Sequence, residues 1–178
     1  MNPKNTLCLI VDIQERLLPA LSGADEMVER CRLLIQGLTA LDVPFAVTEQ
    51  YPKGLGNTVS AVSLLLPEGT PVVEKTRFSA FLPEIQEILR KNDVKHVILM
   101  GTEAHICMLQ TALDLKAQGY AVSLPFECTA SRTTANRDNG LAQLSRQGII
   151  ISNVESILFQ LLGDAKHPAF KTISKLIQ

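Results

Sequence analysis

The sequence predicts a three-layer α/β/α sandwich built on a six-stranded parallel sheet. Apolar runs rich in Ile, Leu and Val alternate along the chain with segments of helical period, which favours parallel strands joined by crossover helices. The first run, residues 7–13, is continuously apolar, as expected for a strand covered on both faces. Hydrophobic residues make up 46% of the 178 residues, enough to fill one core without disulfides.

The local patterns predict the elements in order. Strands are expected over residues 7–13, 44–50, 70–76, 96–101, 120–125 and 149–152. Helices are expected over residues 24–41, 82–92, 104–118, 133–148 and 153–163, followed by an amphipathic tail over 167–177. Acidic residues open the first helix, on the favourable side of its dipole, and residues 52–58 have the composition of a glycine-rich loop. Residues 1–178 thus form one domain, with residues 164–178 as a tail whose apolar stripe needs cover from its own domain or a neighbouring subunit.

Composition excludes several classes of partner and site. The formal charge of −1 and the 4% aromatic content give no basis for binding nucleic acid or an anionic membrane. The apolar stretch at the N-terminus is too short for a secretory signal or a membrane span, so a cytoplasmic location is expected. The four cysteines are scattered, without a CxxC pair, which argues against a zinc site or a disulfide scaffold. A small molecule is the expected partner.

Reactive side chains gather where the predicted strands end. Open parallel sheets bind ligands beyond the carboxyl ends of their strands. Asp12 ends the first strand, Glu49 the second and Lys75 the third, while Glu103 and Cys107 follow the fourth. Although these residues are far apart in the sequence, the fold is expected to bring their strand ends together.

Asp12, Lys75 and Cys107 make chemical sense as a set. Cys107 lies where a strand gives way to a helix, so the unpaired N–H groups there favour a thiolate. Asp12 would take the thiol proton, Lys75 would anchor the carboxylate, and N–H groups of the 101–107 turn would hold an oxyanion. Each residue also has an ordinary alternative: Cys107 as a buried gap filler, Asp12 as a turn cap and Lys75 as a solvated strand-end lysine.

Three segments carry a family resemblance. VDIQ around Asp12, EKTRFSAF around Lys75 and GTEAHICMLQTALD around Cys107 resemble the signatures of the isochorismatase-like cysteine hydrolases, over roughly residues 6–163. TEQYPKGLG, SRT and the tail resemble more narrowly the isochorismatase-domain subgroup of uncertain substrate. The resemblance implies a six-stranded Rossmann-like sandwich, a common tendency to form homo-oligomers, and a catalytic triad at Asp12, Lys75 and Cys107. It also implies a cis peptide at Thr102–Glu103, with the N–H groups of Glu103 and Cys107 forming the oxyanion hole.

The sequence also departs from its relatives. The segment after the second strand, residues 48–51, lacks the histidine of the nicotinamidase metal site, so neither a metal nor a cofactor is expected. Glu103 places a carboxylate at the mouth of the site, which would repel anions such as isochorismate. Arg132 could neutralise Glu127 or meet a substrate, and a structural salt bridge with Glu127 is the expected role.

Gln14, Tyr51 and Phe78 are the expected substrate contacts, with Tyr51 and Phe78 as walls of a small apolar pocket. Phe81, which begins a helix, is expected in the core instead.

The leading hypothesis is a cysteine-dependent hydrolase that cleaves a small amide or carbamoyl C–N bond through a covalent thioester-type intermediate. The alternative is a catalytically silent binding or scaffold protein that retains the fold. A flavodoxin-like nucleotide-binding module is a third possibility, but the sequence contains neither GxGxxG after the first strand nor GxxxxGK[ST].

Overall fold

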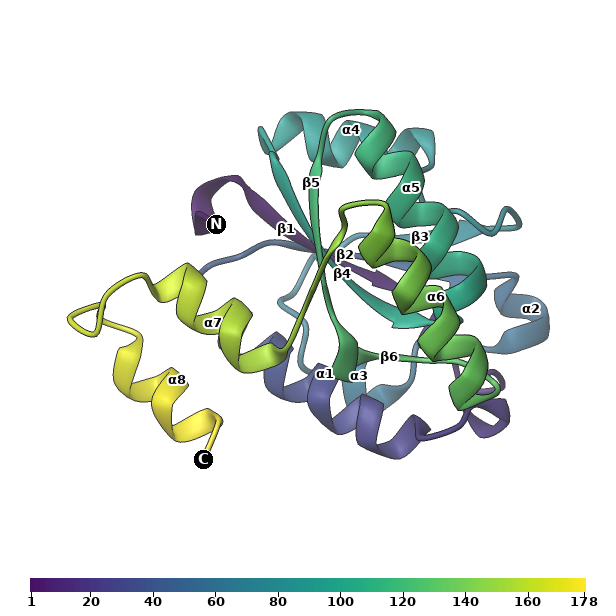
Figure 1. The fold of residues 1–178 in the computed structure, drawn as a ribbon, viewed down its shortest axis with the longest axis horizontal. Coiled ribbons are helices and arrows are strands. Elements are labelled where there is room, and N and C mark those ends of the chain that lie inside the picture. Colours follow the sequence, from purple (N-terminus) through teal and green to yellow (C-terminus); the bar gives the residue numbers. More distant parts are fainter.

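A parallel sheet with helices on both faces forms the centre of the computed structural model, which describes all 178 residues (Figure 1). Its strands are β1 (Thr6–Val11), β2 (Phe45–Gln50), β3 (Val72–Lys75), β4 (His96–Thr102), β5 (Ala121–Pro125), β6 (Thr129–Ala130) and β7 (Ile150–Ser152). Their order is β3-β2-β1-β4-β5-β7, with the two-residue β6 paired to β4 off this path. The predicted α/β/α sandwich is confirmed, and β6 adds a seventh, short strand to the six expected.

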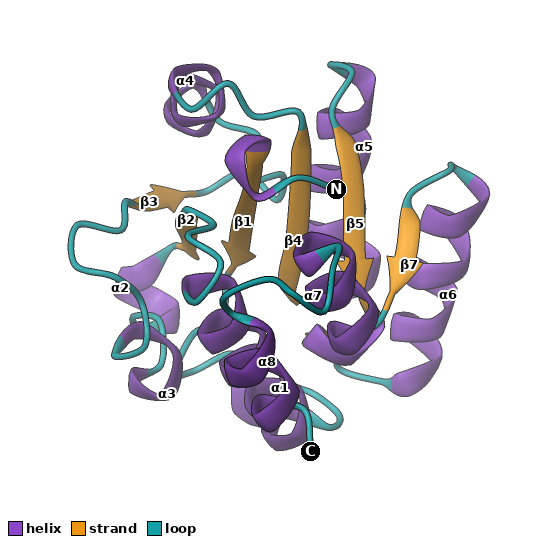
Figure 2. Cartoon of the chain, turned by 90° about the vertical axis from the view of Figure 1, so that its left-hand side faces the viewer, coloured by secondary structure: helices purple, strands orange, loops and turns teal.

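The helices form two layers. They are α1 (Ala24–Thr39), α2 (Pro52–Leu55), α3 (Ser60–Ser63), α4 (Pro83–Lys91), α5 (Leu109–Ala117), α6 (Thr134–Arg146), α7 (Val154–Leu162) and α8 (Phe170–Leu176). Helices α1, α7 and α8 lie on one face of the sheet, while α4, α5 and α6 lie on the other (Figures 1 and 2). Two short helices were not predicted: α2 forms within the expected glycine-rich loop, and α3 follows it.

Strand β1 contributes side chains to two apolar cores, one on each face of the sheet. Cys8 and Ile10 belong to the apolar cluster under α1 and α7, whereas Leu7 and Leu9 belong to the cluster under α4, α5 and α6. All four side chains are fully buried, because successive strand residues point to opposite faces and both faces are covered. The continuous apolar run at the N-terminus is therefore explained by this two-sided burial.

The chain reverses its direction across the sheet between β1 and β4. It passes outward from β1 to β2 and β3, then returns to place β4 on the other side of β1. Such a switch point leaves a crevice beyond the carboxyl ends of the strands. The two strands approach closely there: a Cβ on Gly101, whose φ is +147°, would lie 2.1 Å from the Val11 carbonyl oxygen. Glycine is required at this position.

The C-terminal tail packs on its own domain. Ile173 of α8 is fully buried in the cluster shared with α1 and α7. Phe170 meets Phe159 of α7 edge to face, with ring centroids 6.2 Å apart. The apolar stripe of the tail thus finds most of its cover within the same chain.

Candidate active site

Asp12, Lys75 and Cys107 come from three different elements at the switch point. Asp12 directly follows β1, Lys75 ends β3, and Cys107 lies in a π-helical turn, Ala104–Met108, between β4 and α5. The Lys75 Nζ lies 2.6 Å from Asp12 Oδ2, and the Asp12 carboxylate lies near enough to the Cys107 thiol for each group to shift the pKa of the other. The structure thus brings the three side chains together, with Asp12 between the amine and the sulfur.

The Asp12 carboxylate is held from both sides. Its backbone adopts a left-handed conformation with φ of 57°, an uncommon state for a residue other than glycine that is often found at functional sites. Thr48 Oγ1 of β2 donates to Asp12 Oδ1 at 2.9 Å, and Thr102 Oγ1 of β4 donates to the Asp12 carbonyl oxygen at 2.9 Å. These contacts from the two flanking strands fix both the backbone and the carboxylate.

The Lys75 ammonium is fully buried and surrounded by oxygen acceptors. Besides Asp12, it lies 2.7 Å from Gln50 Oε1, 3.0 Å from the Phe78 carbonyl oxygen and 3.2 Å from that of Arg77. The register explains the first of these contacts, because Gln50 pairs directly with Lys75 across β2 and β3. A buried charge needs such compensation, so the surface role considered for Lys75 is wrong.

Burial holds a proton on the sulfur. It raises the pKa of Cys107 to about 12, an effect that the charge of Asp12 and, less strongly, that of Glu103 reinforce and that Lys75 opposes. Burial also raises the pKa of Asp12, against the opposing effects of Lys75 and of hydrogen bonds from Lys75, Thr48 and Cys107. Desolvation and the neighbouring carboxylate thus outweigh the expected effect of the helix N–H groups, which favours the thiolate.

The turn before Cys107 differs from the expectation. All peptide bonds are trans, so the predicted cis bond at Thr102–Glu103 is wrong. The chain instead turns through a left-handed Glu103, with φ of 54° and ψ of 67°, into the π-helical turn. The Glu103 N–H donates no hydrogen bond, which leaves it free for an incoming oxygen, whereas its carbonyl oxygen accepts from Ile106 N at 2.9 Å.

Glu103 also anchors a small polar cluster beside the thiol. Its Oε1 lies 2.9 Å from Arg132 Nε, and its Oε2 lies 3.3 Å from His105 Nδ1. His105 Nδ1 also lies 3.1 Å from Ser131 Oγ. The expected pairing of Arg132 with Glu127 is wrong: Glu127 lies 3.2 Å from Arg30 and accepts from the first N–H of α7.

The three expected substrate contacts have different surroundings. Gln14 is fully buried. Its Nε2 donates to the carbonyl oxygens of Gln50 and Gly56, and its Oε1 accepts from Gln50 N. Because its amide is already engaged, Gln14 serves to hold the loop around α2, and the expected role in substrate contact is corrected to a structural one. Tyr51 and Phe78, in contrast, are 56% and 55% exposed.

Three polar residues that support the site were missed from the sequence. Thr48 and Gln50 alternate with Glu49 along β2, and this period of two could have placed them together on the face of Asp12 and Lys75. The Glu49 side chain points instead toward Thr58. Its Oε1 accepts hydrogen bonds from Thr58 N at 2.6 Å and from Thr58 Oγ1 at 2.8 Å. Thr111 of α5 accepts from Ala80 N and donates to the Cys107 carbonyl oxygen, joining the loop after Lys75 to the nucleophile turn. No feature of the sequence around Thr111 indicates that it has this supporting role.

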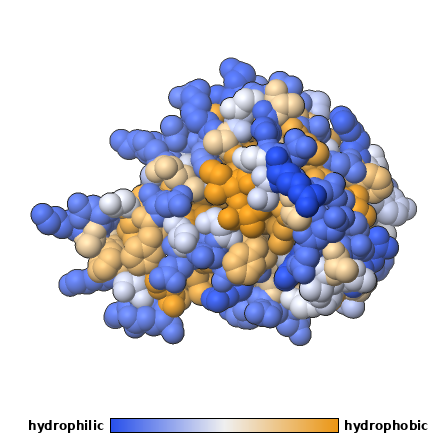
Figure 3. Space-filling view, in the orientation of Figure 1, coloured by the Kyte–Doolittle hydropathy of each residue, from blue (hydrophilic) through white to orange (hydrophobic).

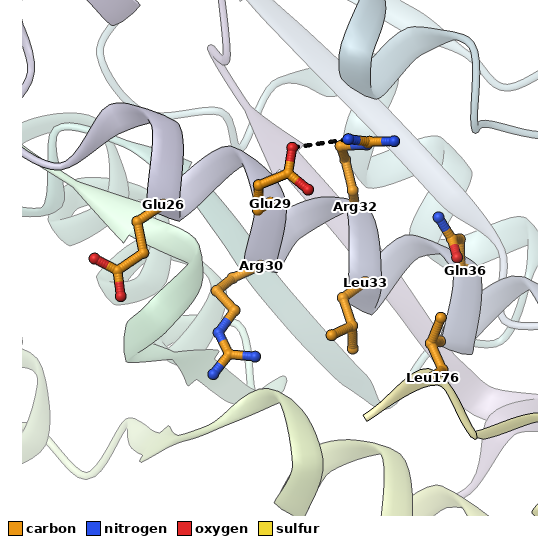
Figure 4. A pocket seen from close by; sticks show the side chains of 7 residues that line it. All are labelled: Glu26, Glu29, Arg30, Arg32, Leu33, Gln36 and Leu176. Atoms are coloured by element: carbon orange, nitrogen blue, oxygen red, sulfur yellow. Dashed lines mark hydrogen bonds and ion pairs between the residues drawn. The ribbon is translucent and has the colours of Figure 1, made fainter. Parts of the chain in front are cut away.

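Other features of the surface lie apart from this site. A cavity of about 360 Å³ opens between α1 and α8, lined by two acidic and two basic side chains of α1 together with Leu33, Gln36 and Leu176 (Figure 4). No three His, Cys, Asp or Glu side chains are grouped so that they could hold a metal ion. Every helix is too short or too polar to cross a bilayer.

Known proteins resemble this chain in sequence and in fold, over a range that includes the candidate site. The family model of the isochorismatase domain matches residues 6–156. Isochorismatase domain-containing protein 1 of Salmo salar is 42% identical over 99% of this chain, which spans only 62% of that relative's length. Among solved structures, the MAR1 ribonuclease of Caenorhabditis elegans superposes with a TM-score of 0.96 at 37% identity, covering 99% of this chain and 91% of that one.

A more distant structure shares the fold alone. The YcaC gene product of Escherichia coli, described as an octameric hydrolase of unknown specificity, has a TM-score of 0.91 at 16% identity, with 99% of this chain and 88% of that one covered. The family model matches most of the chain and includes Asp12, Lys75 and Cys107 within its bounds. The chain therefore belongs to the isochorismatase-domain family.

Proposed function

We propose that this protein is a hydrolase in which Cys107 attacks the carbonyl carbon of a small amide or carbamoyl compound. The observation that carries the proposal is the buried chain of contacts from Lys75 through Asp12 to the Cys107 sulfur. Nucleophile, base and an orienting group in series constitute the general arrangement of covalent catalysis. A buried ion pair contributes little to stability, because the cost of desolvating both charges offsets their attraction. The burial of Lys75 and Asp12 therefore favours a role in catalysis over a role in packing.

The proton rests on sulfur before the reaction and moves as the bond forms. The Cys107 sulfur attacks the carbonyl carbon while its proton passes to Asp12, whose raised pKa suits it to accept one. The carbonyl oxygen becomes an oxyanion and takes hydrogen bonds from the N–H groups of Glu103 and Cys107. Asp12 then returns the proton to the departing nitrogen, and the C–N bond breaks to leave a thioester.

Water completes the cycle. Asp12 removes a proton from the water that attacks the thioester carbonyl, and the sulfur leaves and recovers a proton. Lys75 keeps the carboxylate aligned in both halves, because its Nζ is tied to β2 and to the loop after β3 as well as to Asp12. The residues need no metal or cofactor for these steps.

The test is a panel of small primary amides and carbamoyl compounds assayed for ammonia release. Wild-type protein is expected to turn over at least one member, and Cys107→Ser is expected to lose that turnover by at least about a thousandfold. Cys31→Ala, which removes a thiol of the opposite core, serves as the control and should retain turnover. Intact-protein mass spectrometry after rapid acid quenching should detect the acyl group on the wild type alone.

The main alternative is a binding or scaffold protein that retains the fold. An equal trace of ammonia from wild type and Cys107→Ser across the whole panel, with no acyl adduct, would favour that alternative and reject the hydrolase. Ribonuclease activity, named for the Caenorhabditis elegans relative, is assayed in parallel with single-stranded RNA. We do not propose it, since 17 basic residues against 18 acidic ones provide no evident cationic surface for a phosphodiester chain. A small-molecule substrate and a cytoplasmic location remain our predictions.

A further inference from the structure

Glu103 is an acidic side chain that the proposed reaction does not use, although it lies on the same turn as the nucleophile. Its backbone N–H is assigned to the oxyanion, but its carboxylate has no part in the proton transfers. The side chain is only 8% exposed, and Oε2 is a buried oxygen without a hydrogen-bond partner. A carboxylate in such a position is costly to bury, so a function beyond packing is expected of it.

The charge of this carboxylate is incompletely balanced. Arg132 meets only Oε1, and its own side chain is 57% exposed, so water and salt screen the guanidinium more than the buried carboxylate. His105 Nδ1 lies 3.3 Å from Oε2, and the Glu103 side chain is only 8% exposed, which leaves little of the carboxylate open to direct contact with a small substrate. Glu103 therefore acts on the site through its field rather than by a hydrogen bond. That field reaches the sulfur, since Glu103 is among the groups that disfavour the Cys107 thiolate.

We infer that Glu103 makes the Cys107 site selective against anionic substrates, so that the acyl compound presented to the sulfur is neutral or cationic. The inference rests on the proposed function, because it concerns the same nucleophile, and it narrows the substrate class to amides, ureas and related compounds without a carboxylate near the scissile bond. Glu103 is thus a specificity-determining residue that repels anions before any bond forms.

Thiol-directed probes of matched size and different charge test this inference without knowledge of the substrate. Aminoethyl, sulfonatoethyl and methyl methanethiosulfonate are cationic, anionic and neutral; each transfers its thioalkyl group to sulfur and releases methanesulfinate, while the thiol proton leaves to Asp12 or water. The rate of modification at Cys107 is followed by peptide mass mapping. For each variant, the modification rate with the cationic reagent is divided by the rate with the anionic reagent. This ratio is then divided by the same ratio measured for free cysteine.

Glu103→Gln is expected to lower this normalised ratio by roughly fivefold or more, because it removes one buried negative charge close to the sulfur. Arg132→Gln is expected to raise it, since the carboxylate then loses its counter-charge. Glu29→Gln on the exposed surface of α1 is the matched control and should leave the ratio unchanged. The neutral reagent reports any structural disturbance of the turn, because such a disturbance alters all three rates together.

The outcomes separate the two proposals. A normalised ratio that is the same in wild type, Glu103→Gln and Arg132→Gln, with Cys107 readily modified, overturns the role of Glu103 and leaves the hydrolase intact. Absence of modification by all three reagents even at pH 10, where a thiolate forms, together with absence of turnover in the amide panel, removes the nucleophile, and the inference falls with the proposed function. If Glu103→Gln does not fold, the rise expected for Arg132→Gln decides the question alone.

Discussion

The Cys107 thiol combines a protected position with a high affinity for its proton. Burial, Asp12 and Glu103 together raise its pKa to about 12, so few molecules carry a thiolate at neutral pH. Reactivity then depends on proton transfer to Asp12 during attack, not on a standing population of thiolate. Such a nucleophile is protected from adventitious alkylation and oxidation, because those reactions require the thiolate.

Alkylation by iodoacetamide should reveal this behaviour. The rate at Cys107 in the wild type is expected to rise with pH through at least pH 10, without a plateau near the value of an ordinary thiol. Asp12→Asn removes a neighbouring negative charge while Lys75 remains, so the pKa of Cys107 should fall and alkylation at pH 8 should accelerate. Hydrolysis should be lost in the same variant for want of a base. A wild-type profile that levels off below pH 9 would contradict the raised pKa.

The same proton links the stability of the fold to pH. The folded-state pKa of Cys107 lies above the value of 9.0 for a free thiol, so the folded chain holds this proton more tightly than the unfolded chain does. This contribution is complete below pH 9 and is lost as the pH rises toward 12. Between pH 8 and pH 10.5, the free energy of unfolding of the wild type should therefore fall by about 1–2 kcal/mol relative to Cys107→Ser. Urea titrations of both proteins measure the difference, and parallel pH dependences would refute it.

At the scale of elements, the site depends on how α6 supports the nucleophile turn. A Cβ on Gly140 of α6 would lie 2.8 Å from the carbonyl group of Ala104 and from His105 N, which are backbone atoms of that turn. Because neither can move aside like a flexible side chain, the turn itself would have to shift. Glycine in the middle of a helix costs about 1 kcal/mol relative to alanine, so its presence here reflects this close approach.

Gly140→Ala is accordingly expected to lower Cys107-dependent hydrolysis by about tenfold to a hundredfold, because small displacements of a reacting group are costly. Gly37→Ala in α1 is a matched control: the three atoms nearest to its Cβ would all belong to the flexible Leu158 side chain in the opposite core. That variant should lose some thermal stability but keep its activity per folded molecule. Equal losses of activity in the two variants would show that the contact with the nucleophile turn has no special importance.

The elements also show which parts of the fold were readable in the sequence. The central strands β1 and β4 were predictable because two-sided burial demands continuous apolar runs, and the end of the first run located Asp12. Lys75 instead ends β3, a short edge strand in which Val72 and Glu74 are exposed. The π-helical turn was not predictable, since residues 104–118 have one helical pattern although the first five, Ala104–Met108, adopt a wider turn. The left-handed conformation of Asp12 also leaves no trace in composition, because the contacts that hold it come from Thr48 and Thr102, which lie 36 and 90 positions away in the sequence. The pairing of Arg132 with Glu103 depends on how β6 lies beside β4, a two-residue contact without any sequence signature.

At the scale of the whole molecule, topology accounts for the position of the site. The reversal between β1 and β4 leaves a gap at the carboxyl ends of the strands, where Asp12 follows β1, Lys75 ends β3 and Cys107 follows β4. Both apolar cores are complete on either side of the sheet, so the polar residues at this edge can be arranged for chemistry without weakening the interior. Apolar side chains nevertheless reach the surface, including the region of α7 and α8 at the left of Figure 3.

These exposed apolar side chains lead to a prediction of self-association. Phe78 and Tyr51 are more than half exposed beside the loop that holds Lys75, and neither ring has an aromatic partner; Phe159, in contrast, meets Phe170 edge to face. Large apolar groups that lack intramolecular cover favour burial against a second copy, which would also enclose the Cys107 site.

Light scattering coupled to size-exclusion chromatography should give a mass at least twice 19.5 kDa for the wild type. Phe78→Ser should shift the population toward the monomer, whereas Phe159→Ser should leave the assembly intact. A monomeric wild type at micromolar concentration would refute the prediction, and an assembly disrupted by Phe159→Ser alone would move the interface to α7 and α8.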